Sequence, residues 1–266
     1  MASDSNFKVF ILGGQGFVGS AYARWAVANQ IDYTVITRDN YAEYVGSSCD
    51  LFINANGNSR KYLAKESPLE EFDASVRSVK KSLIDFHSNC YIHLSSCDVY
   101  PDCSQPSTTK EDNIINISQQ SPYGFHKYLA EQCVIHSHSN WIIFRMGGFV
   151  GNGMKKNPIF DILQGQRLWV HPQSQLQYIN TDAAASIVLE LALSGKYKNE
   201  IFNICGEGLI ELMEVINLVG SQVKVEPNSP KVNYEISLEK IQQVVKLPQT
   251  RETVLKFVEN QVGTFS

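Results

Sequence analysis

The sequence predicts an α/β fold of the doubly wound type, built on a mostly parallel sheet. In the first half of the chain, short apolar and β-branched segments alternate with stretches whose apolar residues recur at helical spacing. This strand–helix alternation favours parallel strands joined by crossovers and covered by helices. The expected strands are 7–12, 33–37, 50–55, 91–96 and 141–146, and the expected helices are 17–29, 69–87 and 123–136.

Each element has its own local signal. Residues 7–12 form an apolar run typical of a buried strand, and Val18, Tyr22 and Trp25 then fall on one face of a helix. The second strand is rich in β-branched residues, and the third follows it after only about a dozen residues. Glycine-rich stretches at 56–57 and 147–153 separate later elements.

The pattern also predicts two domains, of which only the first shows a regular alternation of strands and helices. Residues 1–150 are expected to form a dinucleotide-binding domain of the Rossmann type, to which the chain returns near 176–206. Residues 151–266 are less regular and carry a proline-rich patch at 227–230. We expect this part to be mainly a smaller substrate-binding lobe.

Composition excludes several classes of partner. The chain has 23 basic and 27 acidic residues, a net charge of −4, and no block of Lys or Arg, which argues against nucleic acid and anionic membranes as partners. Its apolar runs are far shorter than the ~20 residues of a membrane span, and its first residues do not resemble a signal peptide. Six scattered cysteines without a C-x-x-C pair favour free thiols in the cytoplasm, and no set of residues has metal-ligand spacing.

A glycine motif stands between the first strand and the first helix. Gly13 would allow a tight turn, Gly16 would let a phosphate approach the backbone, and Gly19 would let the helix pack against the strand. The helix N-terminus, including Phe17 and Val18, would add backbone N–H groups that bind a pyrophosphate. The alternative is a plain glycine-rich turn, but the position after a strand and before a helix favours the dinucleotide site.

The end of the second strand carries the residues that distinguish the two nicotinamide dinucleotides. Arg38 could bind a 2′-phosphate with its fork of donors, whereas Asp39 could accept a hydrogen bond from a ribose hydroxyl. We expect NADP, with NAD as the alternative. The alternative without a cofactor role is that Arg38 is a charged loop residue exposed to solvent.

Ser96, Tyr123 and Lys127 form the candidate catalytic set. Tyr123 and Lys127 are one helical turn apart, so they share a helix face. A tyrosine with its ordinary pKa near ~10 is a poor base at neutral pH, and a nearby ammonium favours the phenolate. Ser96, at the end of the fourth strand, could hydrogen-bond a substrate oxygen. By itself the Tyr-x-x-x-Lys spacing more often marks a surface helix; the combination with the glycine motif is more specific.

At this point the chain resembles the extended short-chain dehydrogenase/reductases, often called NAD-dependent epimerase/dehydratases. The resemblance covers roughly residues 7–206 and rests on seven ordered segments, at 13–19, 50–56, 95–100, 121–127, 144–151, 177–182 and 202–206. It implies that Tyr123 exchanges a proton with the substrate oxygen, that Lys127 holds the nicotinamide ribose, and that Ser96 is the third catalytic residue. It also implies that the dinucleotide is lined by the glycine motif, Arg38 and the turn of Ala55, Asn56 and Gly57.

The chain departs from the family pattern at several positions. Leu176 and Gln177 stand where nucleotide-sugar enzymes carry a pyrophosphate-binding arginine, and Ser75 replaces a usual asparagine. Cys97 follows Ser96 as in the GDP-fucose synthase group, but the histidine that completes that acid/base pair is missing. We expect Cys97 to line the site and His126 to face solvent. Cys97, Asn157 and Gln177 are the candidate substrate-binding residues.

The resulting hypothesis is an NAD(P)-dependent oxidoreductase or epimerase that acts on a keto-sugar or sugar hydroxyl, with the sugar linked to a nucleotide. The missing pyrophosphate arginine keeps open a reductase of a smaller, non-sugar carbonyl compound. A dinucleotide-binding scaffold without turnover is the third alternative. Dimerisation through the helices at 69–87 and 123–136, common in the family, is a further expectation.

Overall fold

A computed structural model describes residues 7–58, 60–220 and 222–262 of the chain. Its contacts divide these residues into two compact units. The first comprises residues up to 101, 114–146 and 185–202, and the second comprises 102–113, 147–184 and the residues from 203 onward. No helix in the described part of the chain is long and apolar enough to cross a membrane.

The first unit is built on a parallel sheet, as the sequence predicts. The sheet has the order β2-β1-β3-β4-β5-β9, and the pairings from β2 to β5 are all parallel. The strands are β1 Lys8–Leu12, β2 Asp32–Ile36, β3 Ser48–Asn54, β4 His87–Ser96, β5 Trp141–Met146 and β9 Glu200–Ile204. From β1 the chain adds β2 on one side of the sheet, and it then adds β3, β4 and β5 on the other side. The strand order therefore reverses between β1 and β3, and doubly wound folds bind their ligands in the crevice at the carboxyl ends of two such strands.

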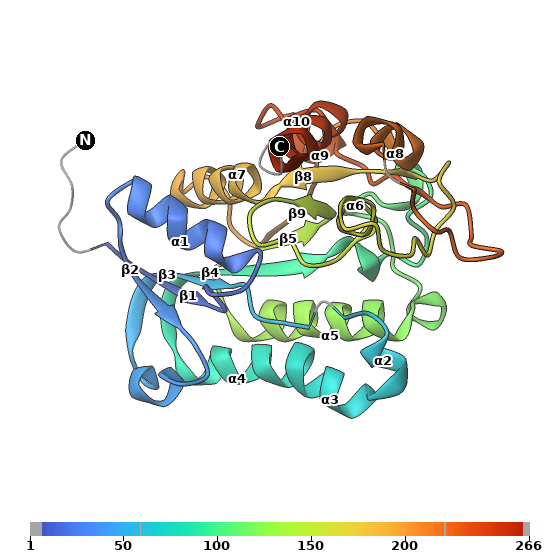
Figure 1. The fold of residues 1–266 in the computed structure, drawn as a ribbon. Helices are drawn as coiled ribbons and strands as arrows, with labels where there is room; N and C mark the ends of the chain where they lie inside the picture. Colours follow the sequence, from blue (N-terminus) through green and yellow to red (C-terminus); the bar gives the residue numbers. More distant parts are fainter. Residues whose placement is uncertain (1–6, 59, 221, 263–266) are drawn as a thin grey trace. The chain divides into compact units, whose positions relative to one another are not determined.

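Helices cover both faces of this sheet. Figure 1 shows α1 (Gly19–Ala28) on one face and α4 (Ser78–Asp85) beside α5 (Pro122–Ser137) on the other. The helix expected over 69–87 is divided into α3 (Pro68–Phe72), a π-helical stretch (Asp73–Arg77) and α4. The short helix α2 (Leu63–Glu66) precedes it, and a 3-10 turn (Tyr41–Tyr44) joins β2 to β3.

Most predicted boundaries agree with the structure to within about two residues, as expected for element ends. The exception is β4, which begins at His87 rather than at residue 91. Its first residues are polar and partly exposed, so they carry no apolar signal, and side chains extend the pairing where Asn89 Nδ2 donates to Asp50 Oδ1 at 2.9 Å.

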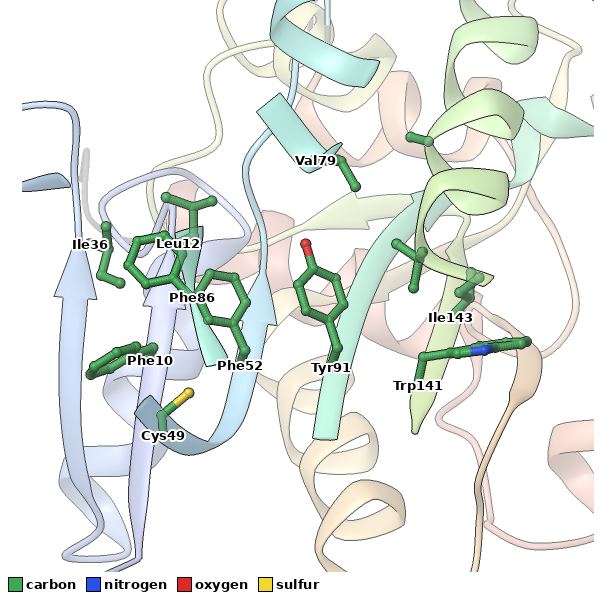
Figure 2. Packing of buried hydrophobic residues seen from close by; sticks show 12 residues of the cluster. Phe10, Leu12, Ile36, Cys49, Phe52, Val79, Phe86, Tyr91, Trp141 and Ile143 are labelled. Carbon is green, nitrogen blue, oxygen red and sulfur yellow. The ribbon is translucent and has the colours of Figure 1, made fainter. Parts of the chain in front are cut away.

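Aromatic packing fills the core between the sheet and α4–α5. Phe52 is fully buried, stacks on Tyr91 with ring centroids 5.2 Å apart, and contacts Phe86 at 5.1 Å. Figure 2 shows Phe10, Phe52 and Tyr91 from three adjacent strands in one row, with Val79 reaching toward them from α4. This rigid layer supports the strand ends that carry the candidate site.

The second unit has a different organisation. It contains a small sheet of order β10-β7-β11 and a parallel pair of β6 and β8. Its strands are β6 Gly148–Val150, β7 Gln175–Leu176, β8 Tyr178–Asn180, β10 Ile210–Glu211 and β11 Asn233–Tyr234. Its helices are α6 Pro158–Leu163, α8 Leu212–Val219, α9 Glu239–Gln242 and α10 Thr250–Val262, and α7 (Thr181–Leu193) begins in it. Buried Asn203 joins distant segments because its Nδ2 donates to the carbonyls of Thr109 (2.6 Å) and Ser237 (3.1 Å).

Each unit draws on three segments of the chain, and residues 102–113 belong to the second unit. The assignment of cofactor binding to one part and substrate binding to the other stays a prediction.

Truncating the central ring of the core should strongly destabilise the first unit. Phe52→Ala leaves a cavity at a fully buried site, so we expect a loss of about 3–5 kcal/mol in the free energy of unfolding. Urea titration followed by circular dichroism measures it. Ile84→Ala, at a side chain that is 66% exposed, is the control and should change stability by less than ~0.5 kcal/mol. Equal losses in both variants would contradict this account of the core.

Candidate active site

The glycine motif forms a tight turn between β1 and α1. Gly13 has φ +81°, and its N–H donates to the Ile36 carbonyl at 3.1 Å. A Cβ at Gly13 would lie 3.0 Å from the backbone of Ala55 and Asn56, and one at Gly19 would overlap the Gly13 carbonyl. Only glycine fits these positions, because the turn brings the ends of β1 and β3 and the start of α1 into direct contact.

A cavity of about 1400 Å³ opens beside this turn, within the first unit. It spans the carboxyl ends of β1, β2 and β3, and its volume is ample for an extended dinucleotide. Seven of the predicted cofactor-binding residues line it: Gly13, Gly16, Arg38, Asp39, Ala55, Asn56 and Gly57. The other five are not part of its lining: Phe17, Val18 and Gly19 lie at the start of α1, and Tyr123 and Lys127 lie on α5.

The turn after β2 places Arg38 and Asp39 side by side on the cavity wall. Asn40 fixes this turn: its Oδ1 accepts from the Thr37 N–H at 2.7 Å, and its Nδ2 donates to the Val35 carbonyl at 3.0 Å. Arg38 and Asp39 are both exposed. Both are therefore positioned to meet the same end of a bound molecule.

Two capping interactions place Ser96 and Tyr123 near each other. Ser96 ends β4; its hydroxyl donates to Asp98 Oδ2 at 2.8 Å and accepts from the Asp98 N–H at 3.2 Å. At the start of α5, the Ser121 hydroxyl accepts from the Gly124 N–H at 3.0 Å. A Cβ at Gly124 would overlap the Asp98 carbonyl, so this glycine lets α5 begin directly against the end of β4.

Lys127 links this cluster to the cavity. It is 6% exposed, and its Nζ lies 5.6 Å from the centroid of the Tyr123 ring. A Cβ at Gly57 would lie 2.7 Å from the same Nζ, so the ammonium packs directly against the turn that follows β3. Gly57 is part of the cavity wall, and the Tyr-x-x-x-Lys face of α5 thereby points at the cavity.

The environment of Tyr123 keeps its phenol protonated. Burial raises its pKa above the ordinary value, the charges of Asp98 and Glu71 raise the pKa further, and the hydrogen bond with Ser96 lowers it. The lowering expected from Lys127 is outweighed, because two carboxylates and desolvation act against the phenolate. The phenol of Tyr123 therefore keeps its proton at neutral pH.

The pKa of Lys127 lies below its ordinary value. Burial lowers it, and the carboxylates of Glu71, Asp98 and Glu131 oppose this effect only in part. His93, fully buried on β4, has its pKa lowered to about 3 by burial and by Lys127, so it is neutral across the physiological range. Because His93 is neutral, it does not repel the ammonium of Lys127.

A sequence model of the family described as "NAD dependent epimerase/dehydratase family" matches residues 9–160. This match covers more than half of the chain and includes the glycine turn, Ser96, Tyr123 and Lys127. The chain belongs to this family. The resemblance found in the sequence is thereby confirmed, and so is the Rossmann-like fold.

Solved structures show the same fold at low sequence identity. The structure of MoeE5 in complex with UDP-glucose and NAD is 13% identical, with a TM-score of 0.80, over 97% of this chain and 100% of that chain. A UDP-galactose 4-epimerase is 15% identical, with a TM-score of 0.78 and the same coverage. A dTDP-4-dehydrorhamnose reductase from Bacillus anthracis in complex with NADP is 14% identical, with a TM-score of 0.77, over 96% of this chain and 99% of that chain. A search of curated protein sequences found no match.

Family membership implies a nicotinamide dinucleotide, and the residues present fit one. The backbone of Gly13 and Gly16 borders the cavity, its volume of about 1400 Å³ is ample, and Lys127 packs against its Gly57 end. Such a cofactor would lie between the turn at Arg38 and the turn at Gly57.

His126 contradicts its sequence-based expectation, because it does not face solvent. It is 9% exposed, and its Nδ1 bonds the buried carboxylate of Glu71 on α3. Phe72 also packs edge-to-face on its ring at 5.4 Å. The expectation was wrong because α3 packs on this face of α5, a contact that helical periodicity in α5 cannot show.

The candidate substrate residues are distributed over both units. Cys97 is fully buried in the first unit, where its thiol donates to the Arg145 carbonyl at 3.2 Å. In the second unit, Asn157 caps α6 by accepting from the Phe160 N–H at 2.9 Å, and buried Gln177 accepts from the Ile236 N–H at 2.7 Å. These three side chains thus have structural partners, and their role in substrate binding stays a prediction.

Sequence reasoning missed the acidic residues of the site. Asp98 bonds Ser96 and also accepts from Lys61 Nζ at 2.7 Å, while Glu71 lines the cavity and bonds His126. Asp98 could have been found from its position two residues after the candidate serine, Ser96, at a strand end. Glu71 gave no such signal, since its helix carries several other acidic residues.

Because Lys127 packs so closely on Gly57, even a methyl group at position 57 should weaken cofactor binding. Gly57 has φ +154°, and Gly57→Ala would push the added methyl group into Lys127 Nζ, so we expect about tenfold weaker binding of NAD(P)H. Fluorescence titration of the reduced dinucleotide measures this affinity. Gly46→Ala, where φ is +82° and no atom lies within 4 Å, imposes backbone strain without the contact and should bind normally. Unchanged binding in Gly57→Ala would contradict the placement of the cofactor.

Proposed function

We propose that this protein is an NAD(P)-dependent reductase or epimerase that acts at a carbonyl or hydroxyl carbon of a nucleotide-linked sugar. The observation that supports it most strongly is the junction at Lys127. One face of α5 carries the ammonium that packs on Gly57 in the cavity wall, and the phenol that bonds Ser96 at the end of β4. Such a junction couples a dinucleotide cavity to a proton donor.

In this proposal each residue has a distinct task. Protonated Tyr123 donates its proton to the substrate oxygen as the carbonyl is reduced, and Ser96 holds that oxygen through its hydroxyl. Lys127 holds the ribose nearest to Gly57. A bound nicotinamide dinucleotide would supply the hydride. Burial and the nearby carboxylates keep Tyr123 protonated, which favours the reduction direction.

The substrate class rests on the structural neighbours. The names of those proteins refer to UDP-glucose, UDP-galactose and a dTDP-linked keto-sugar, and we propose the same class for this chain.

A smaller carbonyl substrate is the second candidate, because two side chains of the second unit that could meet a diphosphate already have partners. Gln177, at the position of the family's arginine, already accepts from Ile236, and Arg167 pairs with Glu226 at 2.6 Å. A panel of keto compounds with and without a linked nucleotide distinguishes the two candidates. Turnover of only the unlinked compounds would reject the nucleotide-sugar proposal.

Removing the Tyr123 hydroxyl should abolish turnover while leaving cofactor binding intact. We expect kcat of Tyr123→Phe to fall by about 10²–10⁴-fold, because the proton donor is lost, and the NAD(P)H affinity to stay within about twofold. Steady-state kinetics and fluorescence titration measure the two quantities. Tyr128→Phe, on the same helix and half-buried, is the matched control. Unchanged function in Tyr123→Phe would instead favour a dinucleotide-binding scaffold.

For the cofactor, we propose NADP bound through Arg38. The guanidinium lies on the cavity wall at the carboxyl end of β2, where a 2′-phosphate would be met, and it is exposed enough to turn toward it. Asp39 beside it keeps NAD as the alternative.

Two single variants decide between these cofactors. Arg38→Gln should weaken NADPH binding by about 10–100-fold and leave NADH binding nearly unchanged, because only the phosphate contact is lost. Asp39→Asn should not weaken NADPH binding. Competition titrations with both reduced dinucleotides measure this, and a selective loss of NADH binding in Asp39→Asn would show that NAD is the bound form.

A further inference from the structure

Glu71 is a buried charge at the end of α3, and the proposed function has not used it. Its side chain is fully buried, which is costly for a carboxylate unless its oxygens are hydrogen-bonded. Ser75 donates its hydroxyl to Oε1, and His126 Nδ1 bonds Oε2. The carboxylate is thereby fixed in place between α3 and α5.

The local backbone is adapted to this arrangement. Between α3 and α4 the chain forms a π-helical stretch over Asp73–Arg77, and this stretch packs on α5. Insertions of this kind are rare and often occur at functional sites. Here the stretch carries Ser75, which stands where the family has asparagine. The residue that departs from the family pattern is therefore also the residue that donates to Glu71.

Glu71 differs from the other charged groups around Lys127. Asp98, on the turn after β4, pairs with Lys61 at 2.7 Å, and Glu131, on α5, pairs with Arg145 at 2.8 Å. The remaining titratable groups are His93 on β4, which is neutral, and Tyr123 on α5, which is protonated. Among the described carboxylates that act on Lys127, Asp98 and Glu131 thus each pair with another cation, whereas Glu71 bonds His126, which balances its charge only when protonated.

Glu71 also lies near the turn against which Lys127 packs. Residues 71 and 57 both border the dinucleotide cavity, the Glu71 carboxylate being buried behind its wall, and Lys127 Nζ packs on Gly57. His126, which holds Glu71, directly precedes Lys127 on α5. The carboxylate, its imidazole partner and the ammonium therefore belong to one connected structure at this end of the cavity.

We propose that Glu71 is a positioning residue whose buried carboxylate, fixed by Ser75 and His126, keeps the Lys127 ammonium charged and seated against the Gly57 turn. This rests on the proposed function, in which Lys127 holds the cofactor ribose. A neutral residue at this position leaves desolvation of the ammonium less opposed.

Direct titration of Lys127 tests the proposal without any turnover. In protein labelled with ¹³Cε-lysine, NMR follows each lysine against pH, and the Lys127 signal is assigned by its absence in Lys127→Met. In Glu71→Gln the midpoint of Lys127 should fall by about one pH unit, because an opposite charge is lost. Glu66→Gln, which removes an exposed carboxylate from the preceding helix α2, is the control and should leave it unchanged. An unchanged midpoint in Glu71→Gln would overturn the proposal.

The pH profile of turnover gives a second readout with a defined sign. Glu71 raises the pKa of both Lys127 and Tyr123, so its neutralisation lowers both. Both limbs of a bell-shaped kcat profile should therefore move to lower pH in Glu71→Gln. A uniform loss of activity with the limbs in place would show a merely structural role. If the wild type turns over no carbonyl substrate, the proposed function fails, and the NMR titration still decides the role of Glu71.

A second variant covers the case in which Glu71→Gln does not fold. His126→Gln keeps the carboxylate and a hydrogen-bond donor, and removes the group that can neutralise Glu71. The Lys127 midpoint should then stay in place or rise. A fall of the midpoint in His126→Gln would contradict the proposal, because the carboxylate would still be present.

Discussion

The structure of the candidate site depends on one constraint, the burial of the Lys127 ammonium against Gly57. A buried cation is costly unless opposite charges or hydrogen bonds compensate for the lost water. Carboxylates on three elements supply this compensation here: Glu71 on α3, Asp98 on the turn after β4 and Glu131 on α5. The acidity of the site thus follows from the need to bury a lysine beside the cavity. Burial and two of these carboxylates, Asp98 and Glu71, also raise the pKa of Tyr123.

These carboxylates also connect the site to the core. Glu131 pairs with Arg145 through both oxygens, and its Oε1 also accepts from the Ser95 hydroxyl at 2.6 Å. Arg145 in turn donates to the Tyr100 hydroxyl at 2.8 Å. A buried network of this kind fixes α5 relative to β4 and β5, and removing one partner would leave an uncompensated charge. The position of Ser96 relative to the helix that carries Tyr123 is therefore set by this buried network.

Much of the site could be predicted from local sequence. Gly13 and Gly19 are needed wherever a strand turns directly into a helix, and Tyr123 and Lys127 share a face at any four-residue spacing in a helix. The residues that failed prediction depend on contacts between elements. His126 is buried because α3 covers it, and Glu71 belongs to the site because a π-helical stretch brings Ser75 and α5 to it. The expectations of a homodimer and a cytoplasmic location remain predictions.

The sequence by itself determined the parallel sheet and its order of helices and strands, and it singled out Ser96, Tyr123 and Lys127 as candidates, because period, glycine placement and residue spacing act within a few residues of chain. Tertiary structure alone decided the electrostatics. Whether Tyr123 is a donor or a base depends on desolvation and on carboxylates 25 and 52 residues away in sequence, namely Asp98 and Glu71. Electrostatic energy depends on distance in space and on burial, and neither quantity is encoded in the local pattern of the chain.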